Sequence, residues 1–128
     1  MNTLEKVYIQ IENNRNAVGY DTVDWPIGYI KNQFDLGVLY IPAYQRNFVW
    51  SSKIKSKFVE SILMGLPIPF LFLYRNKSTG NLEIVDGAQR IQTLVEFLNN
   101  KLKLEELKRL TTLNTKLYSD LPEKFKNI

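Results

Sequence analysis

The strongest constraint on the fold is a strand-like run that passes directly into a helical pattern, at residues 82–98. The run Leu82–Val85 is short and apolar, as in a buried strand. The apolar residues after it recur at the helical spacing i, i+3, i+4 and i+7: Ile91, Leu94, Val95 and Leu98. This spacing is typical of one core-facing helix face. We therefore predict a strand-to-helix corner at Asp86 and Gly87.

Shorter patterns elsewhere in the chain predict more helices and short strands around this corner. Helices are expected from Pro26 to Gly37, from Ser51 or Ser52 to Gly65, over residues 104–110 and after Pro122. Strands are expected over residues 38–42 and 69–76, with a turn at 77–81 that pairs the second of them with 82–86. This order predicts a small α/β or α+β domain with helices packed on a short mixed sheet.

The two ends of the chain differ from this pattern. Residues 1–21 are polar and weakly patterned, so we expect an N-terminal arm, followed by a single domain over residues 22–128. The last helical pattern, with Phe125 and Ile128 three residues apart, stops with the chain. We therefore expect the domain to be truncated on its C-terminal side.

The residue types that are missing exclude several kinds of chemistry. The chain has no cysteine, which excludes disulfides, thiolate catalysis and zinc sites built from cysteine. It has no histidine, which excludes Ser-His-Asp triads and nuclease sites with a histidine general base. An enzyme built from this chain would work with acids, amides, basic groups and a hard metal ion such as Mg²⁺.

No segment of the sequence reads as a membrane or secretion signal. The first residues lack the apolar central region of a secretory signal. The longest apolar run, at residues 66–74, contains two prolines and is far shorter than the roughly 20 residues that span a bilayer. We expect a cytoplasmic protein with no membrane partner.

The predicted corner has the features of an anion site. The first N–H groups of a helix have no intrahelical acceptor and lie at the positive end of the helix dipole, and Gly87 would let a ligand approach closely. At 100° per residue, Gln89 and Thr93 project away from the core face and Arg90 lies on the flank. The alternative is structural: Asp86 caps the helix and Arg90 is a surface residue that pairs with it.

A second cluster of functional side chains precedes the helix expected after Ser51. Aromatic rings that alternate with a guanidinium suit stacking on bases and contacts to phosphate. Arg46 can bind phosphate through two parallel hydrogen bonds, and Gln45 can position a water or a base edge. Tyr44 belongs to the same cluster, whereas Phe48 and Trp50 are better explained by packing around a turn.

The charge is placed unevenly along the chain. No acidic residue lies between Asp35 and Glu60, and this window contains four positive side chains, equal to the net charge of +4. They are Arg46, Lys53, Lys55 and Lys57. An anionic partner such as DNA is one explanation. Ordinary solvation of a helix surface is the other, because alternate spacing spreads the three lysines around a helix.

Three motifs in order resemble the N-terminal domain of the GmrSD family. They are IPAYQRNFVW at 41–50, SILMGLPIPFLFLY at 61–74 and IVDGAQRIQTL at 84–94. The corresponding family signatures are Ile-Pro-x-Tyr/Phe-Gln-Arg-x-Tyr/Phe-x-Trp, Gly-x-Pro-Ile-Pro and Asp-Gly-Gln-Gln-Arg. The segment SDLP at 119–122 is also similar. The chain departs from the third signature at Ala88, where the family has its first glutamine of the corner.

The resemblance implies an α+β fold of the ParB/sulfiredoxin type and a role in modification-dependent, type IV restriction and phage defence. Such N-terminal domains bind and hydrolyse nucleoside triphosphate, and some sense modified DNA. Cutting is done by an HNH-type nuclease domain or a separate subunit, which this chain does not contain. Sulfiredoxin chemistry is excluded, because its catalytic cysteine has no counterpart.

Carried over by motif position, the resemblance assigns roles to particular residues. The nucleotide site would comprise Asp86, Gly87, Gln89 and Arg90, with Tyr44, Gln45 and Arg46 beside it. Gln89 or Gln45 would orient the attacking water, and Asp86 would hold Mg²⁺ that bridges the phosphates.

Two further readings stay open from the sequence. The domain could be a non-catalytic ParB-like DNA-binding module, with Lys53, Lys55 and Lys57 on the phosphates. It could also be an interaction scaffold without a ligand, which would be preferred if an internal pair of Asp86 and Arg90 filled the corner.

Overall fold

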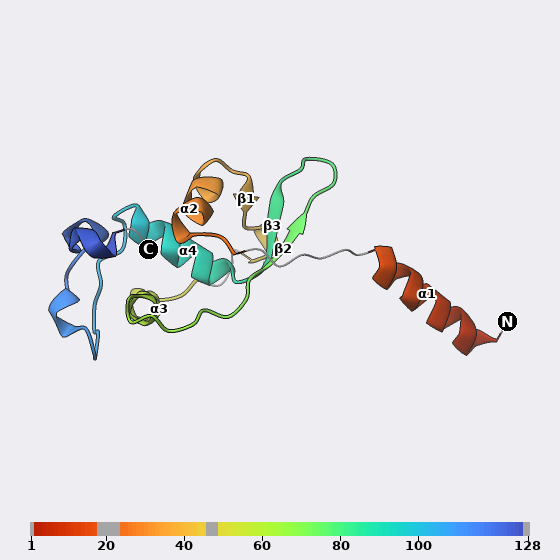
Figure 1. The fold of residues 1–128 in the computed structure, drawn as a ribbon, viewed down its shortest axis with the longest axis horizontal. Coiled ribbons are helices and arrows are strands. Elements are labelled where there is room, and N and C mark those ends of the chain that lie inside the picture. The colour runs from red at the N-terminus through yellow and green to blue at the C-terminus, as the bar shows by residue number, and fades with distance from the viewer. Residues whose placement is uncertain (1, 18–23, 46–48, 127–128) are drawn as a thin grey trace.

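A computed structural model describes residues 2–17, 24–45 and 49–126 of the chain (Figure 1). Its centre is a small mixed sheet with strand order β1-β3-β2. The central strand β3 (Leu82–Asp86) runs parallel to β1 (Leu39–Tyr40) and antiparallel to β2 (Phe72–Arg75). Together with the helices this confirms the α+β class and the pairing of the two later strands.

Two helices cover one face of this sheet. They are α2 (Ile27–Asp35) and α4 (Ala88–Leu98), which lie side by side against it (Figure 1). The helices and strands share one apolar cluster, made of Ile30, Leu39, Ile41, Leu82, Ile84, Ala88, Ile91 and Val95. A third helix, α3 (Ser52–Leu63), packs against α4. Burial of these apolar side chains fixes the sheet and the start of α4 relative to each other.

The helix boundaries follow the predicted capping residues. Pro26 precedes the first residue of α2, and Gly37, with a φ of 78°, follows its end. The side chain of Ser51 accepts a hydrogen bond from the backbone N–H of Ile54 at 3.3 Å and so caps α3. Gly65, again with a φ of 78°, ends that helix in the left-handed region that favours glycine.

The helix predicted over residues 104–110 is wrong, because this segment pairs with the chain that follows it. The backbone N–H of Leu104 donates to the carbonyl of Lys116 at 2.9 Å, and the N–H of Thr115 donates to the carbonyl of Leu104 at 2.7 Å. Glu106 has a φ of 53°, which no right-handed helix contains. Of the leucines whose spacing suggested a helix, Leu104 and Leu107 are buried in the core and Leu110 packs against it.

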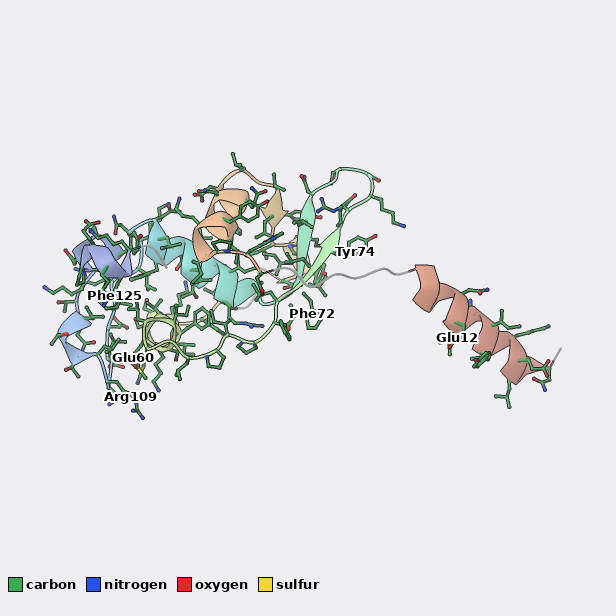
Figure 2. All side chains as sticks on the ribbon, viewed as in Figure 1. Glu12, Glu60, Phe72, Tyr74, Arg109 and Phe125 are labelled. Carbon is green, nitrogen blue, oxygen red and sulfur yellow. The ribbon has the colours of Figure 1, made fainter. Side chains whose placement is uncertain are left out.

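Side chains from other elements bind the backbone N–H groups that a helix would have used. Glu60 Oε2 accepts hydrogen bonds from the N–H groups of Arg109 and Leu110, at 3.0 and 2.9 Å (Figure 2). Ser56 Oγ, on the same face of α3, accepts from the N–H of Glu105 at 3.0 Å. Packing against α3 therefore outweighs the local helical preference of this segment.

These hydrogen bonds surround a second apolar cluster. Its buried members are Val59, Phe97, Leu102, Leu104, Leu107 and Leu121. Residues 111–125, which pack over this cluster, form short 3₁₀ turns rather than α-helices. Pro122 leads into one of these turns, Glu123–Phe125, while Ile128 lies outside the described residues. The predicted helix after Pro122 is thus a single 3₁₀ turn as far as the described chain shows.

The expected N-terminal arm contains a helix, α1 (Thr3–Ala17). Asn2 Oδ1 accepts a hydrogen bond from the N–H of Glu5 at 2.8 Å and so caps it. Figure 1 shows α1 apart from the sheet and the other helices, and none of its described side chains is buried. Within the described residues, no helix is long and apolar enough to cross a membrane.

Candidate functional site

The predicted corner exists, and its conformation requires glycine. Gly87 has a φ of 102° and occupies the cap position of α4, directly after β3 ends at Asp86. A Cβ added to Gly87 would overlap the side chain of Leu71. Both the backbone angle and the close contact favour glycine over other residue types. The cap position belongs to Gly87, so the alternative in which Asp86 caps the helix is wrong.

The first motif reaches this corner through Gln45. Its side chain leaves the 3₁₀ turn Ala43–Gln45, and Nε2 donates to the carbonyls of Ile84 and Val85, at 2.8 and 2.9 Å. These carbonyls belong to the last residues of β3 before the corner. The predicted glutamine of the first motif therefore holds the end of the strand in place.

Gln89 makes a second link between the first and third motifs. Its Oε1 accepts a hydrogen bond from the backbone N–H of Trp50 at 2.8 Å. Gln89 and Thr93 were expected on the side of this helix opposite its core stripe, and that side is not open to solvent, since Thr93 is fully buried. The reason is that α3 covers the face of α4 opposite the sheet, so this helix is buried on two sides.

Arg90 connects the second motif to the corner. One guanidinium nitrogen donates to the carbonyl of Pro69 at 2.6 Å, and the other lies 3.4 Å from the carbonyl of Phe70. Because these two carbonyls face Arg90, β2 begins only at Phe72, three residues later than the predicted strand. Asp86 Oδ2 lies 3.7 Å from Arg90 Nη2, so the internal pair exists, with the aspartate side chain 64% exposed.

The pairing of Asp86 with Arg90 leaves the corner open. A hollow of about 320 Å³ remains beside it, between the first and third motifs. Its lining residues are Gln45, Trp50, Asp86, Gly87, Ala88, Gln89 and Arg90. The condition under which a scaffold without a ligand would be preferred, a filled corner, is therefore not met. Two segments that are distant in sequence thus line one small site, and the second motif contacts it through Arg90.

Trp50 is the lining residue that the sequence analysis assigned to packing alone. It does pack, because its ring meets that of Phe58 edge to face, with 5.8 Å between centroids. It is also half-buried at the wall of the hollow. The sequence contains one indication of this position, because Trp50 lies in the same motif as Gln45. Only the fold shows that both side chains meet at the corner.

Of the predicted residues of the first motif, one does not line the hollow and another lies outside the described residues. Tyr44 is 68% exposed in its 3₁₀ turn and does not line the hollow. Arg46 lies outside the described residues, as does Phe48. Ala88 is buried in the wall, so a methyl group stands where the family signature has an amide.

The carboxylates of the described chain do not gather into a metal site of their own. Nowhere in the described ranges do three or more aspartate or glutamate side chains meet in a way that could hold a metal ion. At the corner Asp86 alone supplies a carboxylate. Mg²⁺ often takes one or two protein carboxylates and completes its shell with water and phosphate oxygens. Asp86 is therefore the carboxylate of the described corner that could hold Mg²⁺ together with a phosphate ligand.

The three predicted DNA-binding lysines do not share one surface. Lys55 is buried and pairs with Glu96 of α4, at 2.8 Å between Nζ and Oε2. Lys53 is exposed and lies 3.0 Å from Glu106, and Lys57 is exposed on the same helix. We therefore remove Lys55 from any interface, because its charge is used between α3 and α4.

The exposed lysines gather around Glu106. A hydrogen bond from Lys53, followed by the charges of Lys53, Lys108 and Lys57, holds the pKa of the Glu106 carboxyl below its usual value. One acid thus faces three positive side chains on this part of the surface. Lys108 was not singled out in the sequence, because it becomes a neighbour of α3 only through the non-helical path of residues 104–110.

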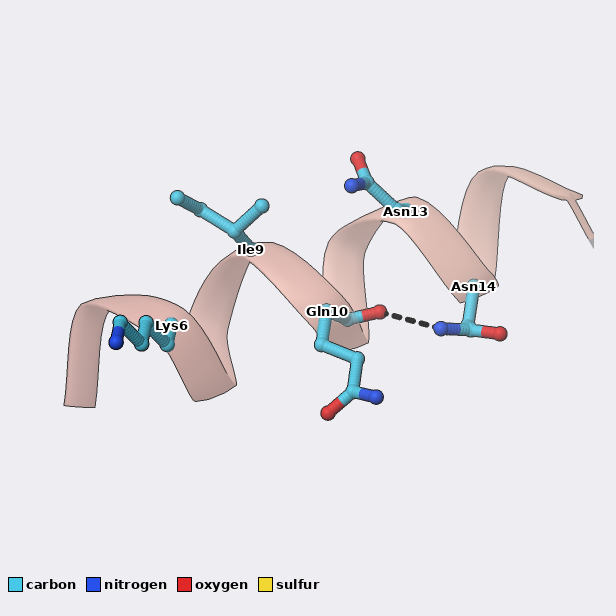
Figure 3. Close-up of a pocket in the computed structure, with 5 residues that line it drawn as sticks. All are labelled: Lys6, Ile9, Gln10, Asn13 and Asn14. Carbon is cyan, nitrogen blue, oxygen red and sulfur yellow. Dashed lines mark hydrogen bonds between the residues drawn. The ribbon is translucent and has the colours of Figure 1, made fainter. Parts of the chain in front are cut away.

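A second hollow lies along α1 and carries no comparable chemistry. It measures about 450 Å³ and is lined by Lys6, Ile9, Gln10, Asn13 and Asn14 (Figure 3). Asn14 Nδ2 donates to the carbonyl of Gln10 at 2.7 Å, which is a contact within the helix. All the walls come from one helix, so we assign no ligand to this groove.

Comparison with known protein families matches residues 27–128 to the GmrSD restriction endonuclease, N-terminal domain. Comparison with curated proteins and with solved structures found no match. The ParB/sulfiredoxin type of fold therefore stays a prediction. The matched region contains all three motifs and the whole corner at which they meet. The chain thus belongs to the family of GmrSD restriction endonuclease N-terminal domains, which are components of type IV restriction systems.

Proposed function

We propose that the corner between β3 and α4 binds a nucleoside triphosphate, and that this domain hydrolyses it as the regulatory or sensor part of a restriction system. The observation that supports this proposal is the hollow itself, which gathers a guanidinium, a carboxylate, two amides and an indole at a helix N-terminus. Each of these groups has a counterpart in the chemistry of a nucleotide with its phosphates.

The phosphates would lie against the start of α4. Helix N-termini bind anions through N–H groups that have no intrahelical partner and through the helix dipole. Arg90 adds a guanidinium with five N–H donors, and the carbonyls of Pro69 and Phe70 use only part of them. Trp50 offers a flat aromatic face on which a base can stack.

The remaining polar groups would serve hydrolysis. Gln45 donates through Nε2 to the backbone, so its Oε1 is the group that would orient the attacking water. Gln89 is a less direct candidate, because its Oε1 already accepts from Trp50. Asp86 would hold Mg²⁺, and the bound ion would neutralise part of the negative charge of the phosphates. Catalysis in such sites is mainly positioning and electrostatic stabilisation, which these few groups can provide.

We expect nucleoside triphosphate binding to depend on Arg90. Isothermal titration of GTP, ATP and CTP with Mg²⁺ should show binding of at least one nucleotide to the native chain. Arg90→Ala should weaken this binding roughly 10- to 100-fold, because a hydrogen bond to a charged group contributes about 1.5–3 kcal/mol. Release of inorganic phosphate, measured on the native chain, tests the hydrolysis step.

The matched control is Arg75→Ala in β2. Arg75 is exposed, donates to the carbonyl of Gly80 at 2.9 Å and does not line the hollow. The variant removes the same charge and should bind nucleotide like the native chain. Arg90 also binds two backbone carbonyls, so Arg90→Ala can lower the stability of the fold. Binding is therefore measured below the melting temperatures of the native chain, Arg90→Ala and Arg75→Ala. No binding by the native chain, or equal binding by Arg90→Ala, would contradict the proposal.

DNA binding is the second candidate, and the lysines around Glu106 favour it. We propose Lys53, Lys57 and Lys108 as the phosphate-binding surface in place of the predicted set with Lys55. Affinity for DNA should then fall with salt, with a log–log slope of about −0.9 for each neutralised phosphate. Filter binding or anisotropy over a salt series measures this slope.

Lys57→Ala should reduce the slope by about one unit. Lys77→Ala, which removes an exposed lysine from the turn between β2 and β3, should leave it unchanged. An affinity that stays flat with salt, or equal slopes for both variants, would exclude this surface as a DNA site.

A further inference from the structure

The second motif lines no part of the corner hollow, although it contacts Arg90 there. Its Pro-Ile-Pro run lies in the irregular segment 66–71, which joins the end of α3 to β2 (Figure 1). At the start of this segment the backbone N–H of Leu66 donates to the carbonyl of Ser61 at 3.0 Å, and from Phe72 onward the chain pairs with β3. Among the described residues, the hydrogen bonds to the backbone between these two points come from Arg90.

The two prolines of this segment restrict its backbone before any partner binds it. A proline fixes its own φ near −65° and keeps the residue before it out of the helical region. Pro67 and Pro69 therefore limit four consecutive residues, 66–69, to extended conformations. The carbonyl of Pro69 thus points in a direction that the chain itself largely sets.

These carbonyls hold the guanidinium of Arg90 more closely than its acidic neighbour does. The nitrogen–oxygen distances are 2.6 Å to Pro69 and 3.4 Å to Phe70, against 3.7 Å to Asp86. The Arg90 side chain is only 15% exposed, while that of Asp86 is 64% exposed and its ion pair is accordingly weak. Carbonyls are neutral acceptors, so they orient the guanidinium without neutralising the charge that attracts an anion.

The segment is also packed against the corner itself. The Leu71 side chain lies against the apolar cluster shared by the sheet, α2 and α4. A Cβ added to Gly87 would overlap it, so the absence of a side chain at that glycine lets the segment lie this close. The second motif therefore contacts the corner twice, through a side chain at Gly87 and through carbonyls at Arg90.

We propose that the second motif is a positioning element of the phosphate site, and that Pro69 is the positioning residue for Arg90. This role rests on the nucleotide site proposed above. A free arginine side chain has many rotamers, and a ligand that binds it must stop this motion. Here the two carbonyls restrain it before the ligand arrives, which raises affinity without a new contact to the ligand. The guanidinium has five N–H donors, so donors remain for a phosphate.

The test is Pro69→Gly, which keeps the carbonyl but removes the restraint on its direction. In titrations of GTP, ATP and CTP with Mg²⁺, the Kd of the nucleotide that the native chain binds should rise roughly 2- to 10-fold. The same change in the Arg90→Ala chain should leave the residual affinity unchanged, because Pro69 acts through Arg90. A merely structural role would weaken binding by the same factor in both chains.

The matched control is Pro122→Gly, at an exposed proline that precedes the 3₁₀ turn Glu123–Phe125 and does not line the hollow. It should bind nucleotide like the native chain. A second measurement needs no nucleotide: NMR relaxation of the Arg90 Nε–H, assigned by its loss in Arg90→Ala. The order parameter should be near that of rigid backbone, about 0.85, in the native chain and the control, and below about 0.6 in Pro69→Gly.

The outcomes separate this role from the nucleotide site. A mobile Arg90 in the native chain, or one equally rigid in Pro69→Gly, would overturn the positioning role. Equal affinities of the native chain and Pro69→Gly, or equal losses in both backgrounds, would overturn it while leaving the nucleotide site in place. If the native chain binds none of the three nucleotides, the proposed function fails and this role fails with it, whatever the relaxation shows.

Discussion

We expect Gly87→Ala to destabilise the domain more than alanine at any other glycine with a positive φ in the described chain. The backbone angle of 102° costs an L residue roughly 1–2 kcal/mol, and the new methyl group overlaps Leu71. The methyl group meets the tip of the half-buried Leu71 side chain, which can rotate away, so overpacking adds about 1 kcal/mol. The sum, about 2–3 kcal/mol, should lower both the melting temperature and the urea midpoint.

Gly80→Ala is the control that separates the two causes. Gly80 has a φ of 76°, but no described atom lies within 4 Å of a Cβ built there. This variant should lose only the backbone term, about 1–2 kcal/mol. Equal losses of unfolding free energy for the two variants would show that Leu71 does not pack against Gly87. Nucleotide binding, where present, should decrease only in Gly87→Ala, because that glycine forms the wall of the hollow.

We expect Glu60→Leu to cost about 3–5 kcal/mol of unfolding free energy. Glu60 is buried, and its carboxylate accepts from the N–H groups of Arg109 and Leu110. Leucine fills a similar volume but leaves both part-buried N–H groups without their protein acceptor, at about 1–3 kcal/mol each. Urea denaturation followed by circular dichroism measures the loss.

Glu60→Gln is the companion variant, because its amide oxygen can still accept both hydrogen bonds. Its expected loss is smaller, about 1–2 kcal/mol, since the bonds lose the charged acceptor. Glu105→Leu is the control at an exposed position, four residues before Arg109, and it should change the stability little. If Glu60→Gln and Glu60→Leu lost the same stability, the two N–H groups would not be the reason that this acid is buried.

The sequence predicted the elements whose signals are local. The helix after Pro26 and the helix capped by Ser51 begin where these residues placed them, and the helix after Gly87 begins at the predicted strand-to-helix corner. Each of these signals involves residues within one turn of each other, so no distant contact is needed to read it. The strand run at residues 82–86 was equally clear, because two apolar residues there point into the core.

The predictions that failed depended on distant partners. The leucines of residues 104–110 have a spacing that suits a helix, but Glu60 and Ser56 bind the backbone there. Lys55 was predicted to belong to a DNA-binding surface, but in the structure it pairs with Glu96 of α4. Thr93 lies on the side of α4 opposite its core stripe, as expected, but only the packing of α3 shows that this side is buried. In each case a side chain about 40 or more positions away, or a helix packed across the face, decided the outcome.

The candidate site divides in the same way. Sequence motifs alone selected Gln45, Asp86, Gly87, Gln89 and Arg90, all of which line one hollow. They could do so because these residue types and their order already carry the chemistry of an anion site. The sequence could not assign Trp50 to the wall or exclude Tyr44 from it, since both lie in one motif and differ only in the direction of the side chain.

By itself the sequence determined the α+β class, the glycine corner and the family, because capping, period and motif order are properties of neighbouring residues. Only the tertiary structure decided which groups meet at that corner. Gln45 reaches it across 39 positions and Arg90 holds a carbonyl 21 positions earlier. Such contacts form only when the core closes, since burial of the apolar faces of α2, α4 and the sheet brings the three motifs together.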